Sequence, residues 1–183
     1  VIRELEALLR PGMAFVGVHP VAGKETVGAA AADADLFRGR RVIVTPSRRS
    51  TAAAVDKIET LWRATGARLE RMTPEMHDAL LARASHLPQL VASALAVTLG
   101  DEQVEGRWAA AYGAGGLRDT TRIAASSAEM WRDICLTNHE ALSAAARLFR
   151  GVFEEFERAL ADGDGAALCA LFERGRAMRE RLQ

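Results

Sequence analysis

Two spacings of apolar residues divide the first 72 residues into helices and strands. Apolar positions three and four residues apart predict helices over 2–9 and 55–62, and the second helix is expected to stop at Gly66. Two short β-branched runs, 14–18 and 41–45, predict strands, and residues 67–72 alternate between polar and apolar as a half-exposed strand does. The order helix, strand, strand, helix, strand is typical of the end of an α/β sheet domain.

Strand signals stop at residue 73, and long helical stripes follow. A threonine and a proline begin a stripe that covers 73–100, as expected of a helix cap and a first helical residue. Ser126 and Glu129 form a capping-box pattern, from which one continuous helix is predicted to residue 161. A last helix is expected to start near Asp164.

These patterns predict an α/β remnant at 1–72 followed by an all-α helical domain at 73–183. A helix as long as the one expected over 126–161 carries more apolar surface than one small domain covers. Such a stripe is usually covered by another subunit, so we expect a homodimer formed through the helical domain.

Charge and cysteine content exclude several classes of protein. The 24 basic and 24 acidic residues cancel, so no overall field attracts nucleic acid or an anionic membrane. Cys135 and Cys169 form no disulfide framework or zinc pattern and are expected to be buried thiols of a cytoplasmic protein. The longest apolar run, 90–99, is too short to span a bilayer. Residue 1 already lies in a helical pattern, which indicates no signal peptide and a start within the fold.

The histidines of the helical part differ in their surroundings. His77 and His86 are nine residues apart, which at about 100° per residue puts them on opposite sides of a straight helix. Only one of them can then face a pocket. Pro88 removes a backbone donor beside His86, which favours His86, and the alternative is a helix kink with an incidental imidazole.

His19 directly follows the predicted strand 14–18, where α/β folds often place ligands. Gly23 would let the backbone approach a bound molecule, and Glu25 could orient the histidine or a neighbouring donor. The alternative is a tight loop with a histidine in solvent.

Arg118 and Arg122 form a third candidate cluster. They are four residues apart, so on an α-helix they would share one face and could bind carboxylates of a substrate. Two surface arginines paired with Asp119 and Glu129 are the alternative.

A series of motifs spans nearly the whole chain in a fixed order. They are H-P-V-A-G-K-E at 19–25, L-F-R-G-R at 36–40, V-T-P at 44–46, S-H-L-P at 85–88, G-G-L-R-D-T-T-R-I at 115–123 and M-W-R-D-I-C-L-T-N at 130–138. Their order and spacing resemble the prephenate dehydrogenase family, which includes arogenate dehydrogenases. The resemblance implies that residues 1–72 are the C-terminal part of a Rossmann-type domain.

The resemblance also implies a reaction and a set of roles. The reaction is the NAD- or NADP-dependent oxidative decarboxylation of prephenate to 4-hydroxyphenylpyruvate in tyrosine biosynthesis, with arogenate as the alternative substrate and no metal. His19 would be the general base and Arg122 would bind a substrate carboxylate. The remaining implied site residues are Arg118, His86, Glu25 and Gly116 for the substrate, and Gly23 and Lys24 for the cofactor.

The chain departs from the family pattern at several points. Val18, Gln89, Leu117 and Thr120 replace residues that are usual in the motifs, and no G-x-G-x-x-G is present to hold a pyrophosphate. The resemblance therefore covers the end of a dinucleotide domain and the helical domain. The alternative is a non-catalytic helical dimer that binds an aromatic or dicarboxylate ligand or assembles with a partner.

Overall fold

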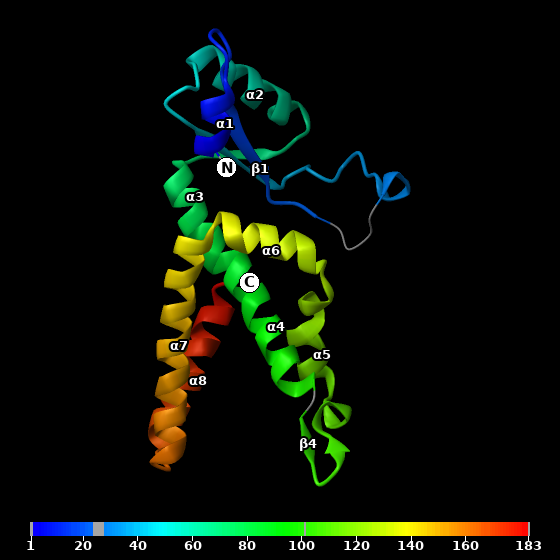
Figure 1. The fold of residues 1–183 in the computed structure, drawn as a ribbon, viewed down its shortest axis with the longest axis vertical. Coiled ribbons are helices and arrows are strands. Elements are labelled where there is room, and N and C mark those ends of the chain that lie inside the picture. Colours follow the sequence, from blue (N-terminus) through cyan, green and yellow to red (C-terminus); the bar gives the residue numbers. More distant parts are fainter. Residues whose placement is uncertain (1, 24–27, 101, 183) are drawn as a thin grey trace. The chain divides into compact units, whose positions relative to one another are not determined.

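A three-stranded sheet forms the centre of the first part of the chain (Figure 1). Its strands are β1 (Val16–Pro20), β2 (Arg41–Pro46) and β3 (Arg68–Arg71), in the order β1-β2-β3. β1 runs antiparallel to β2, and β2 runs parallel to β3. The structure, a computed structural model, describes residues 2–23, 28–100 and 102–182 and divides into two compact units, Val1–Leu81 and Ala82–Gln183.

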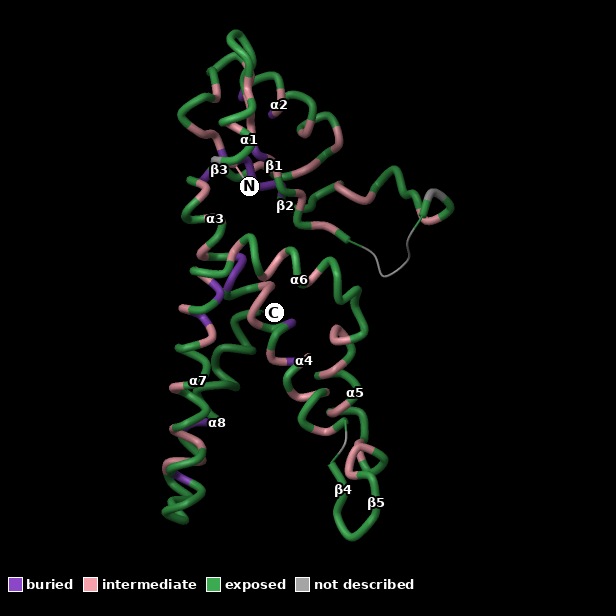
Figure 2. The backbone as a smooth tube through the Cα atoms, in the orientation of Figure 1, coloured by how far each residue is buried: buried purple, intermediate pink, exposed green. Residues whose placement is uncertain are grey.

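The core of the first unit lies around the central strand. Val42 and Val44 are fully buried, and Ile43 between them is buried as well, so both faces of β2 are covered (Figure 2). The helices α2 (Ala52–Ala64) and α3 (Pro74–Leu81) both contact β2. Ile43 packs in one cluster with Met72 and Leu81, which brings α3 against the sheet.

The first strand lies two residues later than the sequence pattern predicts. β1 begins at Val16 and includes His19 and Pro20, which pair with Ile43 and Val42. The expectation that His19 follows the strand was wrong, because pairing with β2 extends the strand through it. Proline is tolerated there because β1 is an edge strand. Since β1 is antiparallel, His19 lies beside the start of β2 and not at the carboxyl edge of parallel strands.

A buried carboxylate links α2 to β3. Glu59 is 3% exposed and accepts hydrogen bonds from the guanidinium groups of Arg63 and Arg71. The hydrogen bond from Arg71 is the largest influence on the pKa of Glu59 and lowers it, with Arg63 acting in the same direction and burial opposing both. The carboxylate is therefore held ionised inside the first unit.

Glu59→Gln is expected to lower the free energy of unfolding by about 1–3 kcal/mol at neutral pH, because it removes charge-assisted hydrogen bonds from a buried site. The folded pKa of Glu59 lies below its unfolded value, so its contribution is complete above the unfolded pKa and is lost as pH falls through the folded pKa. Urea denaturation as a function of pH tests both points. Glu70→Gln, at a half-exposed ion pair with Arg41, is the control and should change stability by less than about 1 kcal/mol. Equal effects of the two variants would contradict the prediction.

The second unit begins within a long helix. A π-helical turn, Ala82–His86, separates α3 from α4 (Leu87–Gly100). Pro88 lacks an amide hydrogen, and its ring would clash with the carbonyl group four residues earlier, in this turn. The predicted disturbance beside Pro88 is confirmed as the wider π-helical turn.

The other elements of the described chain are mostly helical. They are α1 (Ile2–Leu8), the 3₁₀ turns Ala29–Ala31, Ala109–Tyr112 and Arg122–Ala125, the strands β4 (Gln103–Val104) and β5 (Arg107–Trp108), and the helices α5 (Gly115–Thr121), α6 (Ala128–Thr137), α7 (His139–Ala161) and α8 (Gly165–Glu180). The expected fold class, a remnant of an α/β domain followed by a helical domain, is confirmed. The β4–β5 hairpin was not expected. Its turn has positive φ angles at Glu105 and Gly106, and glutamate is not a usual residue for that conformation.

The long helix predicted over 126–161 is two helices. Asn138, with φ −122° and ψ 31°, leaves the helical conformation between α6 and α7. The apolar spacing continues in phase across Asn138, so the sequence pattern did not reveal the break. The cap is also one residue later than predicted, because Ser127 accepts the hydrogen bond from the Met130 amide, whereas Ser126 donates to the Ile123 carbonyl.

Two further expectations change with the structure. Neither cysteine is buried in the single chain, since Cys135 is half-buried and Cys169 is exposed on α8. One helix, Pro74–Gly100, is long and apolar enough to cross a membrane by length and composition, with a mean hydropathy of 1.2 over its best window. Core helices of water-soluble proteins meet the same two criteria, so this helix is weak evidence for a membrane span.

Candidate functional site

A histidine pair and an aspartate lie together in the first unit. Nδ1 of His19 is 2.8 Å from Nε2 of His77, and the two rings meet edge to face with centroids 5.1 Å apart. Nδ1 of His77 is in turn 2.8 Å from Oδ1 of Asp78. The three side chains form a connected chain of hydrogen bonds from α3 to the edge strand.

The first turn of α3 positions His77. The Thr73 side chain accepts a hydrogen bond from the Met76 amide, and the His77 amide donates to the Thr73 carbonyl at 3.0 Å. His19 is positioned by the pairing of β1 with β2. The sequence indicated His19 but favoured His86 over His77. The contact of His77 with His19 joins residues 58 positions apart and leaves no local signal in the sequence.

Its surroundings favour the neutral form of His19. Partial burial is the main cause that lowers the pKa of His19 from its usual value of 6.5, and the neighbouring His77 lowers it further. A histidine with a lowered pKa is unprotonated at neutral pH. His19 can therefore act as a proton acceptor, and its side chain lies at the exposed surface of the unit.

A second group surrounds His86 at the end of the π-helical turn. The Asn138 amide Nδ2 donates to Nδ1 of His86 at 3.2 Å, and the rings of His86 and Trp131 meet edge to face with centroids 6.1 Å apart. Asn138 therefore both ends α6 and contacts the candidate histidine. Among the described residues, Trp131 Nε1 is a buried donor with no hydrogen-bond partner.

The two candidate arginines lie on consecutive short elements. Arg118 is in the last turn of α5, whereas Arg122 begins the 3₁₀ turn Arg122–Ala125, and both are exposed. Arg122 keeps a helical conformation, with φ −50° and ψ −45°, so one continuous helical segment carries both arginines. Two exposed guanidinium groups so close in the chain still form a positive surface suited to carboxylates.

Gln89 holds the turn that carries Arg122. Its side chain is only 6% exposed, and Nε2 donates to the Ile123 carbonyl at 3.0 Å, which links α4 to the 3₁₀ turn. The Ser126 hydroxyl donates to the same carbonyl at 2.7 Å. Sequence reasoning treated Gln89 only as a departure from the motif, because its contact is with a backbone group 34 residues away.

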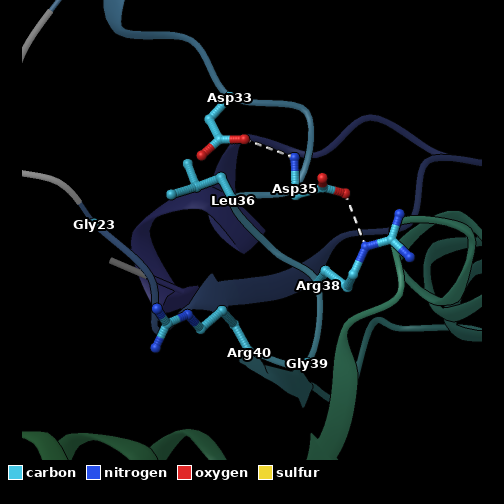
Figure 3. Close-up of a pocket in the computed structure, with 7 residues that line it drawn as sticks. All are labelled: Gly23, Asp33, Asp35, Leu36, Arg38, Gly39 and Arg40. Carbon is cyan, nitrogen blue, oxygen red and sulfur yellow. Dashed lines mark hydrogen bonds and ion pairs between the residues drawn. The ribbon is translucent and has the colours of Figure 1, made fainter.

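Gly23 borders an open cavity of about 300 Å³ in the first unit (Figure 3). Arg38 pairs with Asp35 across 2.8 Å at this cavity, and Asp33 accepts a hydrogen bond from the Asp35 amide. The other lining residues are Leu36, Gly39 and Arg40. The cavity therefore combines two guanidinium groups with two carboxylates.

The structure describes some of the remaining candidate site residues and not others. Lys24 and Glu25 lie outside the described residues. Gly116 is exposed in the first turn of α5, where an added Cβ would meet nothing within 4 Å. In residues 2–23, 28–100 and 102–182, no group of three or more His, Cys, Asp or Glu side chains could hold a metal ion. The structure groups the candidates into two sets: His19 and Gly23 belong to the first unit, whereas His86, Gly116 and the two arginines belong to the second.

Two sequence-family models match the chain. Residues 1–71 match the model described as the nucleotide-binding domain of prephenate dehydrogenase, and residues 73–174 match its dimerization domain. Together they cover most of the chain.

Individual relatives agree with the family models. The chain is 36% identical to the cyclohexadienyl dehydrogenase of Zymomonas mobilis over all of its length and 62% of that protein. It is 40% identical to the prephenate dehydrogenase of Bacillus subtilis over 69% of the chain and 34% of that protein. A crystal structure of prephenate dehydrogenase from A. aeolicus, in complex with hydroxyphenyl propionate and NAD+, matches all of the chain and 63% of its own, with 32% identity and a TM-score of 0.91. The chain thus spans less than two thirds of the length of each of these proteins.

Proposed function

Because the chain belongs to the prephenate dehydrogenase family, we propose that the full-length protein is a cytoplasmic NAD- or NADP-dependent dehydrogenase of aromatic amino acid biosynthesis. We propose prephenate as its substrate and 4-hydroxyphenylpyruvate as its product, and arogenate as the alternative substrate. The observation that carries the proposal is His19, a histidine with a lowered pKa, supported by His77 and Asp78.

We propose one role in this reaction for each candidate residue. His19 takes the proton of the substrate hydroxyl group when hydride leaves the same carbon. Arg122 binds a substrate carboxylate, and Arg118 adds positive charge beside it. We propose that His86, Gly116 and Glu25 each contact the substrate, as the family resemblance implies. Loss of the ring carboxylate as carbon dioxide then makes the ring aromatic.

The residues present fit only the reacting end of a dinucleotide. His19 is exposed and Gly23 borders the open cavity of the first unit, so we propose that Gly23 and Lys24 contribute to binding of the nicotinamide. The sequence has no G-x-G-x-x-G turn, so these residues do not hold the pyrophosphate. When bound, the nicotinamide supplies the hydride acceptor of the reaction.

Reduction of the nicotinamide, followed by absorbance, tests the proposed function. The full-length protein is assayed with prephenate and with arogenate, each with NAD and with NADP. Turnover with prephenate and release of carbon dioxide support the proposal, and turnover with arogenate alone assigns the alternative substrate. No turnover with any of the four pairs contradicts the proposed enzyme and favours a non-catalytic helical dimer.

The apolar face of α7 supports dimer formation. Phe153 is 54% exposed and stacks on Phe149, and Leu148 and Leu160 are also exposed on this helix. Apolar side chains exposed in a row on one helix favour a protein interface. We therefore propose that two copies of the chain associate through the second unit, in keeping with the dimerization domain matched at residues 73–174.

Phe153→Glu is expected to convert the dimer to a monomer, because an ionised carboxylate would be buried at the interface without a partner. Sedimentation velocity on the full-length protein measures the change. Arg147→Glu introduces the same side chain at an exposed polar position of α7 and should leave the dimer intact. A Phe153→Glu variant that remains dimeric at micromolar concentration would place the interface elsewhere.

A further inference from the structure

The hydrogen bonds that join Asp78, His77 and His19 take a single direction if Asp78 is ionised and His77 is neutral, because each ring nitrogen donates or accepts according to the tautomer. An ionised carboxylate only accepts hydrogen bonds, so Nδ1 of His77, 2.8 Å from Asp78 Oδ1, carries a proton. Nε2 of a neutral His77 is then unprotonated and accepts a hydrogen bond from Nδ1 of His19, 2.8 Å away. Neutral His19 is left with an unprotonated Nε2, the atom with which a base would act.

We propose that His77 and Asp78 are positioning residues that hold His19 in the tautomer protonated on Nδ1. The inference rests on the proposed function, because the base that they orient is the base of that reaction. Asp78 acts through His77 and not on the substrate. The same arrangement of carboxylate and imidazole orients the base in hydrolases with a catalytic triad, here with one more imidazole in the chain.

The proton transfer balances with this tautomer. As the substrate O–H bond breaks, its proton goes to Nε2 of His19 and its electron pair forms the carbonyl bond, while the C–H pair leaves as hydride to the oxidised nicotinamide. Loss of carbon dioxide returns an electron pair through the ring to that oxygen, which takes the proton back from His19. Between these steps the imidazolium of His19 donates from Nδ1 to His77, and the Asp78 carboxylate stabilises its charge.

The surroundings of His77 agree with a fixed role. Its side chain is 20% exposed, in contrast to the exposed imidazole of His19, so it is the more enclosed member of the pair. Its backbone is held in the first turn of α3 through Thr73. The edge-to-face arrangement of the two rings leaves the in-plane nitrogen atoms directed at each other.

Two substitutions of His77 distinguish a hydrogen bond that positions His19 from a role in packing alone. His77→Leu has no acceptor for Nδ1 of His19 and is expected to lower kcat by about 10- to 100-fold with little change in KM. His77→Gln retains an acceptor oxygen and is expected to recover most of the lost kcat. Equal loss in both variants, or a loss confined to KM, would overturn the proposal. Circular dichroism and thermal unfolding check that both variants are folded.

Nuclear magnetic resonance of the imidazole nitrogens gives a readout that needs no turnover. In the full-length protein at neutral pH, His19 is expected to be protonated on Nδ1 and unprotonated on Nε2, and Asp78→Ala is expected to raise the population of the other tautomer. A proton on Nε2 of His19 in the unsubstituted protein would overturn the inference even if the enzyme turns over. Absence of turnover together with the expected tautomer would instead contradict the proposed function alone.

Discussion

His19→Asn is expected to lower kcat by about 10²- to 10⁴-fold, the usual contribution of a general base, with little change in KM. Asparagine keeps a polar side chain on the edge strand but cannot take a proton. Steady-state kinetics of the full-length protein with prephenate measures the effect. The size of the loss follows from removing the proposed acceptor of the hydroxyl proton.

The pH dependence of the same assay tests the protonation state of His19. Because its pKa lies below the usual value of 6.5, the base form persists to lower pH, and kcat/KM should fall only as pH drops through that lowered pKa. His139→Asn, at an exposed histidine at the start of α7, is the matched control and should leave both kcat and the profile unchanged. Full activity in His19→Asn, or a kcat/KM that shows no fall on the acid side of the pH profile, would remove His19 from the mechanism.

Arg122→Gln is expected to raise KM by about 10- to 100-fold, because a charge-assisted pair with a substrate carboxylate is worth about 1.5–3 kcal/mol. The proposed contact with the carboxylate would be made in the ground state and the transition state alike, so kcat should change less than KM. Inhibition by a substrate analogue that lacks one carboxylate tests whether Arg122 binds that carboxylate. That analogue should bind the variant and the unsubstituted protein with similar affinity if it lacks the carboxylate that Arg122 binds.

A control substitution at another exposed arginine shows whether the rise in KM is specific to Arg122. Arg176 is exposed on α8, where it pairs with Glu180 at 3.8 Å, and Arg176→Gln should leave KM unchanged. An unchanged KM in Arg122→Gln would refute the assignment of that residue. A variant of Gln89, which bonds to the carbonyl next to Arg122, would then show whether the turn itself contributes to binding.

Several signals that lie close together in the sequence were read correctly. The central strand 41–45, the helix that ends before Gly66 and the start of the last helix at Asp164 agree with β2, α2 and α8. Each depends on neighbouring residues: a β-branched run, a glycine with positive φ, or an aspartate that accepts hydrogen bonds from the next amides. The motif series likewise indicated the family that the chain belongs to.

Features that depend on distant partners were missed or misplaced. The strand register that includes His19, the break at Asn138 and the exposure of Cys169 are such features. An antiparallel partner extends β1 beyond its apolar run. The helix break preserves the apolar spacing, so periodicity cannot reveal it.

The order of the helices and strands in residues 2–71, the family and the choice of His19 and Arg122 as candidates could be predicted without a structure, because they follow from motifs and local conformational preference. The groups that act on those candidates became visible only in the folded chain. His77 lies 58 residues from His19, and Gln89 lies 34 residues from the carbonyl that it holds. Contacts of this kind arise when the sheet and helices pack, and a hydrogen bond of 2.8 Å between distant residues has no local signature in the chain.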